Sequence, residues 1–212
     1  MMLITRTIVF AMMCLLSPLA GAHPHSFIDI DSSLVIQKQQ LVGVRMVWEM
    51  DELTSAALLL DAAMAKDSPL VWQSMADELM ENTRNQLYFS YMKLNDKPVQ
   101  LAEKADNYSL SRHGNKAVFT FVLPLVNPIP LKNNTITLST YEQSYYVDMR
   151  YPSEKSIHLT DDIAAICSVK LTTPKPDASL MAYARSLDKN DSPGEDMMLG
   201  SKFAQTVTLK CH

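Results

Sequence analysis

The chain has 212 residues and a mildly acidic balance, with 19 Lys and Arg against 23 Asp and Glu and a formal net charge of −4. No block of clustered basic residues occurs along it, and such blocks are what nucleic acids and anionic membranes select. These two classes of partner are therefore excluded. The chain has five glycines, and it carries no glycine-rich phosphate loop, nucleophile elbow or paired-histidine metalloprotease helix. We therefore expect it not to be an enzyme.

Residues 1–22 have the pattern of an export signal. Arg6 supplies a positive start, residues 8–16 form an apolar run, and Ala20-Gly21-Ala22 places small residues where signal peptidase cuts. The apolar run is shorter than the ~20 residues that a membrane-spanning helix needs, and no later segment is long and apolar enough to span a bilayer. We expect cleavage after Ala22, a periplasmic chain of residues 23–212, and no insertion into the membrane after processing.

A β-hairpin is predicted at the start of the mature chain. Residues 26–36 alternate loosely and are rich in Ile, Val and Phe, and residues 41–48 place Val and Met on the same face as Trp48. The polar turn at residues 37–40 joins them, which is typical of two paired strands.

A helical pair is predicted to follow as an insertion at about residues 51–85. Residues 52–65 are dense in Ala and Leu without Gly or Pro, and Asp51 is suited to cap this helix. Ser68-Pro69 begins a second helix that extends to about Asn85. We expect the second helix to bury four apolar side chains, which are Leu70, Val71, Met75 and Leu79.

Strands dominate the remainder of the chain. A Pro-rich break is expected at residues 127–130 and a helix at residues 177–187. The other patterned segments are predicted strands, at residues 87–94, 108–111, 116–123, 135–140, 144–151, 163–171 and 206–211. The sum predicts a single α+β domain over residues 23–212, mostly antiparallel β and sandwich-like, with the inserted helical pair and a short C-terminal helix.

Two cysteines remain after the expected processing, Cys167 and Cys211. In an oxidising compartment such a pair predicts a disulfide. The bridge would close a loop of roughly 45 residues and stabilise the fold by about 4 kcal/mol at most. A metal site made by the two thiolates is the alternative. The disulfide is favoured because one bridge satisfies both thiols and holds the end of the chain.

Two of the five histidines of the chain, His23 and His25, stand within the first three residues of the expected mature protein. After cleavage, the α-amine and imidazole of His23 can chelate one metal ion, and His25 can add a third nitrogen. Pro24 has no backbone N–H to deprotonate, so the square-planar terminal chelate of copper and nickel is blocked. Zinc is therefore the expected cofactor, with nickel or cobalt as alternatives. The other interpretation is a polar N-terminus whose histidines are incidental.

Carboxylates near these histidines complete the predicted metal site. Asp29 follows within the first strand, and Asp51 and Glu52 lie where the second strand returns towards the start of the first. If the two strands pair, Asp51 and Glu52 come close to the histidines. A solvated strand face is the alternative for Asp29, and helix capping is expected for one of the other two.

An aromatic cluster at Tyr141, Tyr145 and Tyr146 is either core packing or a cleft wall near the metal. His113 is expected to be a turn residue, and His158 is expected to be exposed.

Several stretches of the sequence resemble a family of uncharacterised periplasmic proteins. They are AHPHSFID at residues 22–29, VWEMDELTSAALL at 47–59, LNDKPVQL at 94–101, YEQSYYVDM at 141–149 and the C-terminal cysteine pair. Members of that family are typically encoded beside, or fused to, permeases of the NicO type, which move nickel, cobalt or zinc. The resemblance implies a periplasmic component of transition-metal transport. By position, the resemblance matches His23 and His25 to the paired histidines of the family and Asp29 to its acid after Phe-Ile. It matches Asp51 and Glu52 to the acidic pair after the tryptophan strand. It matches three further residues, Tyr141, Tyr145 and Tyr146, to the tyrosine segment.

We therefore expect a periplasmic accessory protein that captures a divalent transition metal and delivers it to an inner-membrane permease of the NicO type. One alternative is a copper-dependent oxidative enzyme, in which the N-terminal histidine holds copper and His113 or His158 completes the site. Copper-dependent consumption of ascorbate and oxygen would distinguish it. The other alternative is a structural binding module with no metal role.

Overall fold

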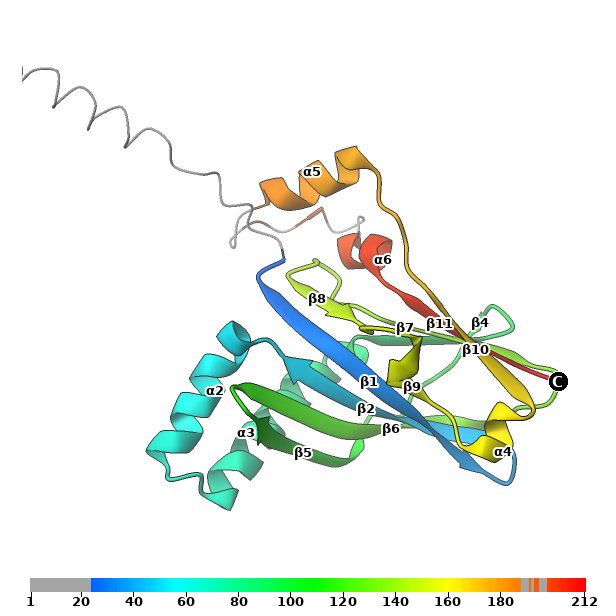
Figure 1. Ribbon diagram of the computed structural model, residues 1–212, viewed down its shortest axis with the longest axis horizontal. Coiled ribbons are helices and arrows are strands. Elements are labelled where there is room, and N and C mark those ends of the chain that lie inside the picture. The colour runs from blue at the N-terminus through cyan, green and yellow to red at the C-terminus, as the bar shows by residue number, and fades with distance from the viewer. Residues whose placement is uncertain (1–23, 188–190, 192, 195–197) are drawn as a thin grey trace, which may run out of the picture.

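The computed structural model describes residues 24–187, 191, 193–194 and 198–212. In this part of the chain, two β-sheets face each other across one apolar core, and a helical pair lies beside them (Figure 1). The predicted export signal, its cleavage point and His23 lie outside the described residues.

The first sheet is built around the hairpin that the sequence predicts. β1 (Ser26–Gln37) pairs antiparallel with β2 (Gln40–Met50), and the two turn residues between them have positive φ, which suits the twist of the strands. The sheet order is β5-β6-β2-β1-β8, and β8 and β9 both run parallel to β1. The added strands are β5 (Asp106–His113), β6 (Lys116–Pro130), β8 (Val147–Arg150) and β9 (Ile157–His158).

The second sheet is antiparallel throughout, in the order β10-β11-β7-β3-β4. Its strands are β3 (Ser90–Leu94), β4 (Lys97–Pro98), β7 (Thr135–Thr140), β10 (Cys167–Thr172) and β11 (Thr206–Cys211). Cys167 and Cys211 are cross-strand neighbours and form a disulfide. The predicted disulfide is therefore confirmed, and the alternative of a thiolate metal site is wrong.

The helical pair consists of α2 (Glu52–Met64) and α3 (Pro69–Arg84), which pack against β6 and β5 (Figure 1). Asp51 caps α2, and Ser68 stands at the N-cap of α3 with Pro69 in its first position, as predicted. Shorter helices follow later in the chain. They are η1 (Leu87–Phe89), η2 (Glu154–Ser156), α4 (Asp161–Ala164), α5 (Ala178–Ser186) and α6 (Leu199–Phe203).

The side chains that α3 buries differ in one respect from the prediction. Leu70 is 81% exposed, whereas Met75 is buried and Val71 and Leu79 are partly buried. Leu70 stands on the opposite side of the helix from the buried positions, so the prediction that it packs in the core is wrong.

A predicted break and the start of a predicted strand also differ from the structure for local reasons. Residues 127–130 continue β6 instead of breaking it, because beyond Val126 this stretch pairs with β2 alone, and a strand edge tolerates the missing N–H of proline. The predicted strand at residues 163–171 starts late, because α4 occupies its beginning. Two aspartates in the first turn of α4 favour that helix.

The segment before β3 is a tight turn instead of the predicted strand. Leu87, Tyr88 and Phe89 all have positive φ, which is unfavourable for residues with large side chains. The turn buries Tyr88, whose hydroxyl donates to the carbonyl of Glu103 and accepts from the N–H of Ala105. These two hydrogen bonds and the burial of the ring offset the strained backbone.

The α+β, sandwich-like class is confirmed. Trp48, Phe119 and Phe121 form the aromatic centre of the core, and each is at most 1% exposed. Within the described residues, no helix is long and apolar enough to cross a membrane.

Candidate functional site

His25 lies at the amino end of β1, where the chain enters the first sheet. Its backbone N–H donates to the carbonyl of Tyr146 at 2.9 Å, and its ring centroid lies 4.7 Å from that of Tyr146. Tyr146 immediately precedes β8, so the parallel pairing of β1 with β8 determines the place of His25. Two of the predicted site residues are thus neighbours. His23 is two positions ahead of His25 and outside the described residues.

The outer face of the first sheet carries both charged and aromatic side chains next to His25. Phe27 and Asp29 share a face with His25, because alternate residues of a strand do so. The register sets Phe27 opposite Asp148 and Asp29 opposite Arg150. Arg150 Nε lies 3.5 Å from Asp29 Oδ1. Asp29 therefore stands next to a cation that a metal ion would have to displace.

Asp148 is a partly buried carboxylate that the predicted ligand set does not include. Burial raises its pKa, the positive charge of Arg150 opposes this rise, and the negative charge of Asp29 adds to it. No hydrogen bond from the described residues stabilises its ionised form. A cation bound beside Asp148 would favour that form. The alternation of side chains in YYVDM, at residues 145–149, predicts which face of the strand Asp148 lies on. The pairing of β8 with β1 is what brings Asp148 near His25.

Asp51 lies next to the start of β1, as the predicted hairpin requires. Its Oδ2 accepts from the N–H of Phe27 at 2.8 Å and from the hydroxyl of Thr54 at 2.5 Å. Its Oδ1 accepts from the N–H groups of Leu53 and Thr54 at 2.8 and 3.0 Å. Burial raises the pKa of Asp51, but these hydrogen bonds together outweigh burial and lower it. Asp51 therefore caps α2 and ties it to β1. Glu52, next to it, is exposed.

A polar cavity of about 340 Å³ opens beside this cap. Three carboxylates, two cations and one aromatic ring line it, from Asp29, Glu49, Asp51, Lys116, Arg150 and Phe27. Two of the five predicted ligands, Asp29 and Asp51, thus face a common space, and the negative charges outnumber the positive ones.

Glu49 is the lining carboxylate that sequence analysis missed. Its carboxylate accepts from Lys116 Nζ at 2.7 Å and contacts His113 Nδ1 at 2.9 Å. The hydrogen bond from Lys116 first, and that with His113 next, lower the pKa of Glu49. The signal was present in the sequence: Glu49 stands between two buried residues, Trp48 and Met50, so it faces outwards beside Asp29.

The two histidines of the copper alternative both pair with carboxylates of the first sheet. His113 contacts Glu49, and His158 Nε2 lies 2.7 Å from Asp31 Oδ2. His158 of β9 is paired with Ser33 of β1. Ser33 lies eight residues after His25, and each residue of a strand adds about 3.3 Å, so His158 is roughly 25 Å from His25 along β1. His158 is therefore too far from His25 to share a metal ion with it.

The three tyrosines of the predicted cleft have different neighbours. Tyr141 stacks on Tyr91 with centroids 4.3 Å apart, and Tyr145 stacks on Phe203 of α6 at 4.0 Å. Burial, and then the charge of Asp148, raise the pKa of Tyr145 to about 12. Tyr146 contacts His25 and is 41% exposed. The tyrosine segment therefore supports the site mainly by packing.

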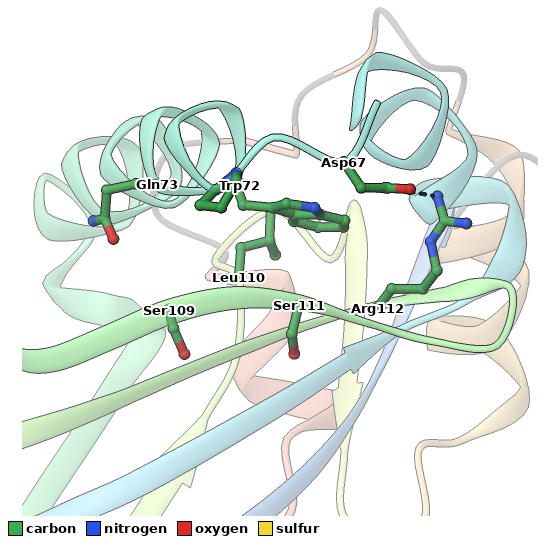
Figure 2. A pocket seen from close by; sticks show the side chains of 8 residues that line it. Asp67, Trp72, Gln73, Ser109, Leu110, Ser111 and Arg112 are labelled. Carbon is green, nitrogen blue, oxygen red and sulfur yellow. Dashed lines mark ion pairs between the residues drawn. The ribbon is translucent and has the colours of Figure 1, made fainter. Parts of the chain in front are cut away.

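No group of three or more His, Cys, Asp or Glu side chains close enough to hold a metal ion occurs within the described part of the chain. Other cavities lie away from the predicted site residues. One of about 470 Å³ lies between α3 and β5, where Figure 2 shows Trp72 above Ser109 and Ser111 and Asp67 paired with Arg112. Another, of about 680 Å³, lies beside β3.

The chain is similar to the members of one protein family. The profile of the family described as "Protein of unknown function (DUF1007)" matches residues 8–211. A protein of Haemophilus influenzae described as "Uncharacterized protein" is 35% identical over 191 residues, which are 90% of this chain and 91% of that relative. No solved structure matches the chain.

Proposed function

The chain belongs to the DUF1007 family of proteins of unknown function, and we propose that it is a periplasmic metal-binding accessory protein without catalytic activity. It captures a divalent transition metal, zinc first and nickel or cobalt next. It then delivers the ion to an inner-membrane permease of the NicO type.

The observation that carries this proposal is the arrangement at the amino end of β1. His25 stands there beside Tyr146, and the outer face continues with Asp29 and the partly buried Asp148. Imidazole nitrogens and carboxylate oxygens are ligands that zinc takes in tetrahedral sites. Asp29 and Asp148 are near enough to act on each other electrostatically, so a divalent cation between the strands would neutralise two like charges.

The ligand set is completed by His23. With its ring and the α-amine that cleavage after Ala22 would expose, His23 supplies two nitrogens, and His25 supplies a third. Asp29 or Asp148 then provides an oxygen. Asp51 is assigned to the cap of α2, because both of its oxygens already accept hydrogen bonds. Glu52 is exposed at the edge of the site and serves as an entry group.

The disulfide supports the proposed compartment. Disulfides form and persist in oxidising compartments such as the periplasm, and Cys167–Cys211 joins the edge strand β10 of the second sheet to its neighbour β11.

Isothermal titration of zinc into the processed protein tests the proposal. The double variant His23→Ala/His25→Ala should lose at least tenfold in zinc affinity, because two of the proposed ligands disappear. The matched control is His113→Ala/His158→Ala, which removes the same number of imidazoles from carboxylate pairs elsewhere on the first sheet. The control should bind zinc as the wild type does. Equal affinity of the first variant and the wild type would contradict the proposal.

A further inference from the structure

Helix α2 carries an apolar face that the rest of the described chain leaves uncovered. Leu53, Leu60 and Met64 are 81%, 60% and 76% exposed. Ala56, Ala57 and Ala63 between them are exposed as well. The opposite side of the helix holds the buried Ser55 and Ala62. Figure 1 shows α2 at the periphery of the molecule. Single exposed apolar residues are common, but a continuous stripe of them marks a contact surface.

The spacing of this stripe is that of a helix–helix seam. Residues 53, 57, 60 and 64 follow steps of four, three and four, which is the 3.5-residue repeat of helices that pack along their length. The stripe consists of three large side chains, Leu53, Leu60 and Met64, and one small one, Ala57. Alanines in such a seam allow two helix axes to approach within about 8 Å.

We propose that a second copy of this chain covers the stripe, with the two α2 helices antiparallel about a twofold axis that passes between residues 58 and 59. This arrangement sets Leu53 against the partner's Met64 and Ala57 against the partner's Leu60. A large side chain then meets a small one at the centre of the seam, and each contact occurs twice because of the symmetry.

Charge favours the antiparallel direction. Glu52 lies in the first turn of α2, and Lys66 follows the end of the helix. Neither belongs to an ion pair within the described residues. Antiparallel packing places Glu52 beside the partner's Lys66 at both ends of the seam, and it opposes the two helix dipoles favourably. Parallel packing would place like charges side by side.

Both ends of α2 are held by the protein, so the stripe is a fixed surface. The carboxylate of Asp51 caps the amino end. At the other end Arg112 donates to the carbonyl of Leu59 at 3.2 Å and pairs with Asp67 at 3.7 Å, as Figure 2 shows for the ion pair. A helix that is already ordered loses little conformational entropy when it associates.

The length of α2 limits the surface area that two such helices can bury, and this area limits the affinity of the proposed dimer. A helix of 13 residues is about 20 Å long, so the helix pair buries less than the roughly 800 Å² per partner of a standard interface. We therefore expect a weak dimer with a dissociation constant on the order of 10 µM.

Analytical ultracentrifugation of the processed protein from 1 to about 500 µM tests the pairing, with circular dichroism to verify folding. The wild type should dimerise, and Leu60→Glu should raise the dissociation constant at least tenfold. Leu87→Glu is the matched control, because Leu87 is 61% exposed at a distant turn, and it should dimerise as the wild type does. A wild type that stays monomeric, or a Leu60→Glu variant that dimerises normally, would overturn the proposal. If the wild type is monomeric but Leu60→Glu abolishes metal transport in cells, the stripe belongs to a different protein partner.

Cysteine cross-linking tests the direction of the helices. The symmetry places Ala57 close to its counterpart and separates Leu53 from its counterpart by about 16 Å along the axis. Under mild oxidation Ala57→Cys should form a covalent dimer and Leu53→Cys should not. A covalent dimer of both Leu53→Cys and Ala57→Cys would show parallel packing and contradict the proposed arrangement. Zinc affinity is measured separately, so failure of the dimer leaves the proposed metal site untouched.

Discussion

Two aspartates near the start of β1, Asp51 and Asp148, have pKa values that are shifted in opposite directions. The hydrogen bonds of Asp51 outweigh its burial and lower its pKa, whereas Asp148 accepts no such bonds from the described residues and burial raises its pKa. A lowered pKa indicates a carboxylate stabilised by the fold. A raised pKa at a partly buried site indicates a carboxylate whose ionised form reduces the stability of the fold, which is common among functional groups.

Replacing Asp148 by Asn should separate stability from metal binding. Above its raised folded-state pKa, the charged carboxylate of Asp148 destabilises the fold, and this cost disappears as the pH falls below the unfolded value of ~3.9. Asp148→Asn should therefore raise the midpoint of thermal unfolding of the metal-free protein at pH 7, and the advantage should shrink in acid. The same variant should weaken zinc binding about tenfold.

Asp106→Asn, at an exposed acid of β5, is the control for Asp148→Asn and should change neither quantity. A loss of stability in Asp148→Asn at pH 7, or an unchanged zinc affinity, would count against the role given to Asp148.

At the scale of the residue, the outward direction of Glu49 could be predicted from its place between Trp48 and Met50. The surroundings of Asp148 could not, because β1 and β8 are separated by more than a hundred residues and pair in parallel. No local pattern specifies which distant strand joins a sheet edge.

Among the elements, α2 has the most local specification. Its start follows from the cap at Asp51, and its composition of Ala and Leu favours helix throughout. Asp51 also accepts a hydrogen bond from the N–H of Phe27, and the Thr54 hydroxyl lies 2.8 Å from the Ser26 hydroxyl. The helix is thus tied to the strand that carries His25. The sequence could not show that the apolar residues of α2 exceed what the core can cover, because burial depends on packing against β6.

Loss of this cap should destabilise the protein in a pH-dependent way. Asp51→Ala should lower the free energy of unfolding at pH 7 by about 1–2 kcal/mol, because two N–H groups of α2 and that of Phe27 lose their acceptor. The lowered pKa of Asp51 means that its stabilisation is complete above ~3.9 and is lost as the pH falls through its folded-state pKa. Urea unfolding at pH 7 and in acid measures both effects.

Asp61→Ala removes a charge from the exposed side of the same helix and serves as the control for Asp51→Ala. Its effect should stay within about 0.5 kcal/mol. An Asp51→Ala variant whose deficit is no larger than that of the control, or is independent of pH, would contradict the structural role of Asp51.

At the scale of the whole molecule, the two sheets share one core, and the residues proposed to bind a metal lie outside it. The hydrophobic alternation predicted the hairpin, β7 and β11, and the cysteine pair predicted the bridge that closes a separation of 44 residues. The mixed first sheet and the added helix α6 were not predicted. Gly200 of α6 lies so near the carbonyl of Glu142 that a Cβ would be 1.8 Å from it, and such a contact between distant segments leaves no local signature.

The most direct test of a metal site at the front of the mature chain is zinc K-edge X-ray absorption on the exported protein loaded with one equivalent of zinc. The account predicts nitrogen and oxygen ligands at about 2.0–2.1 Å, with the scattering pattern of imidazole, and loss of that pattern in His23→Ala/His25→Ala. Sulfur at about 2.3 Å, or an imidazole pattern that persists in the double variant, would contradict it.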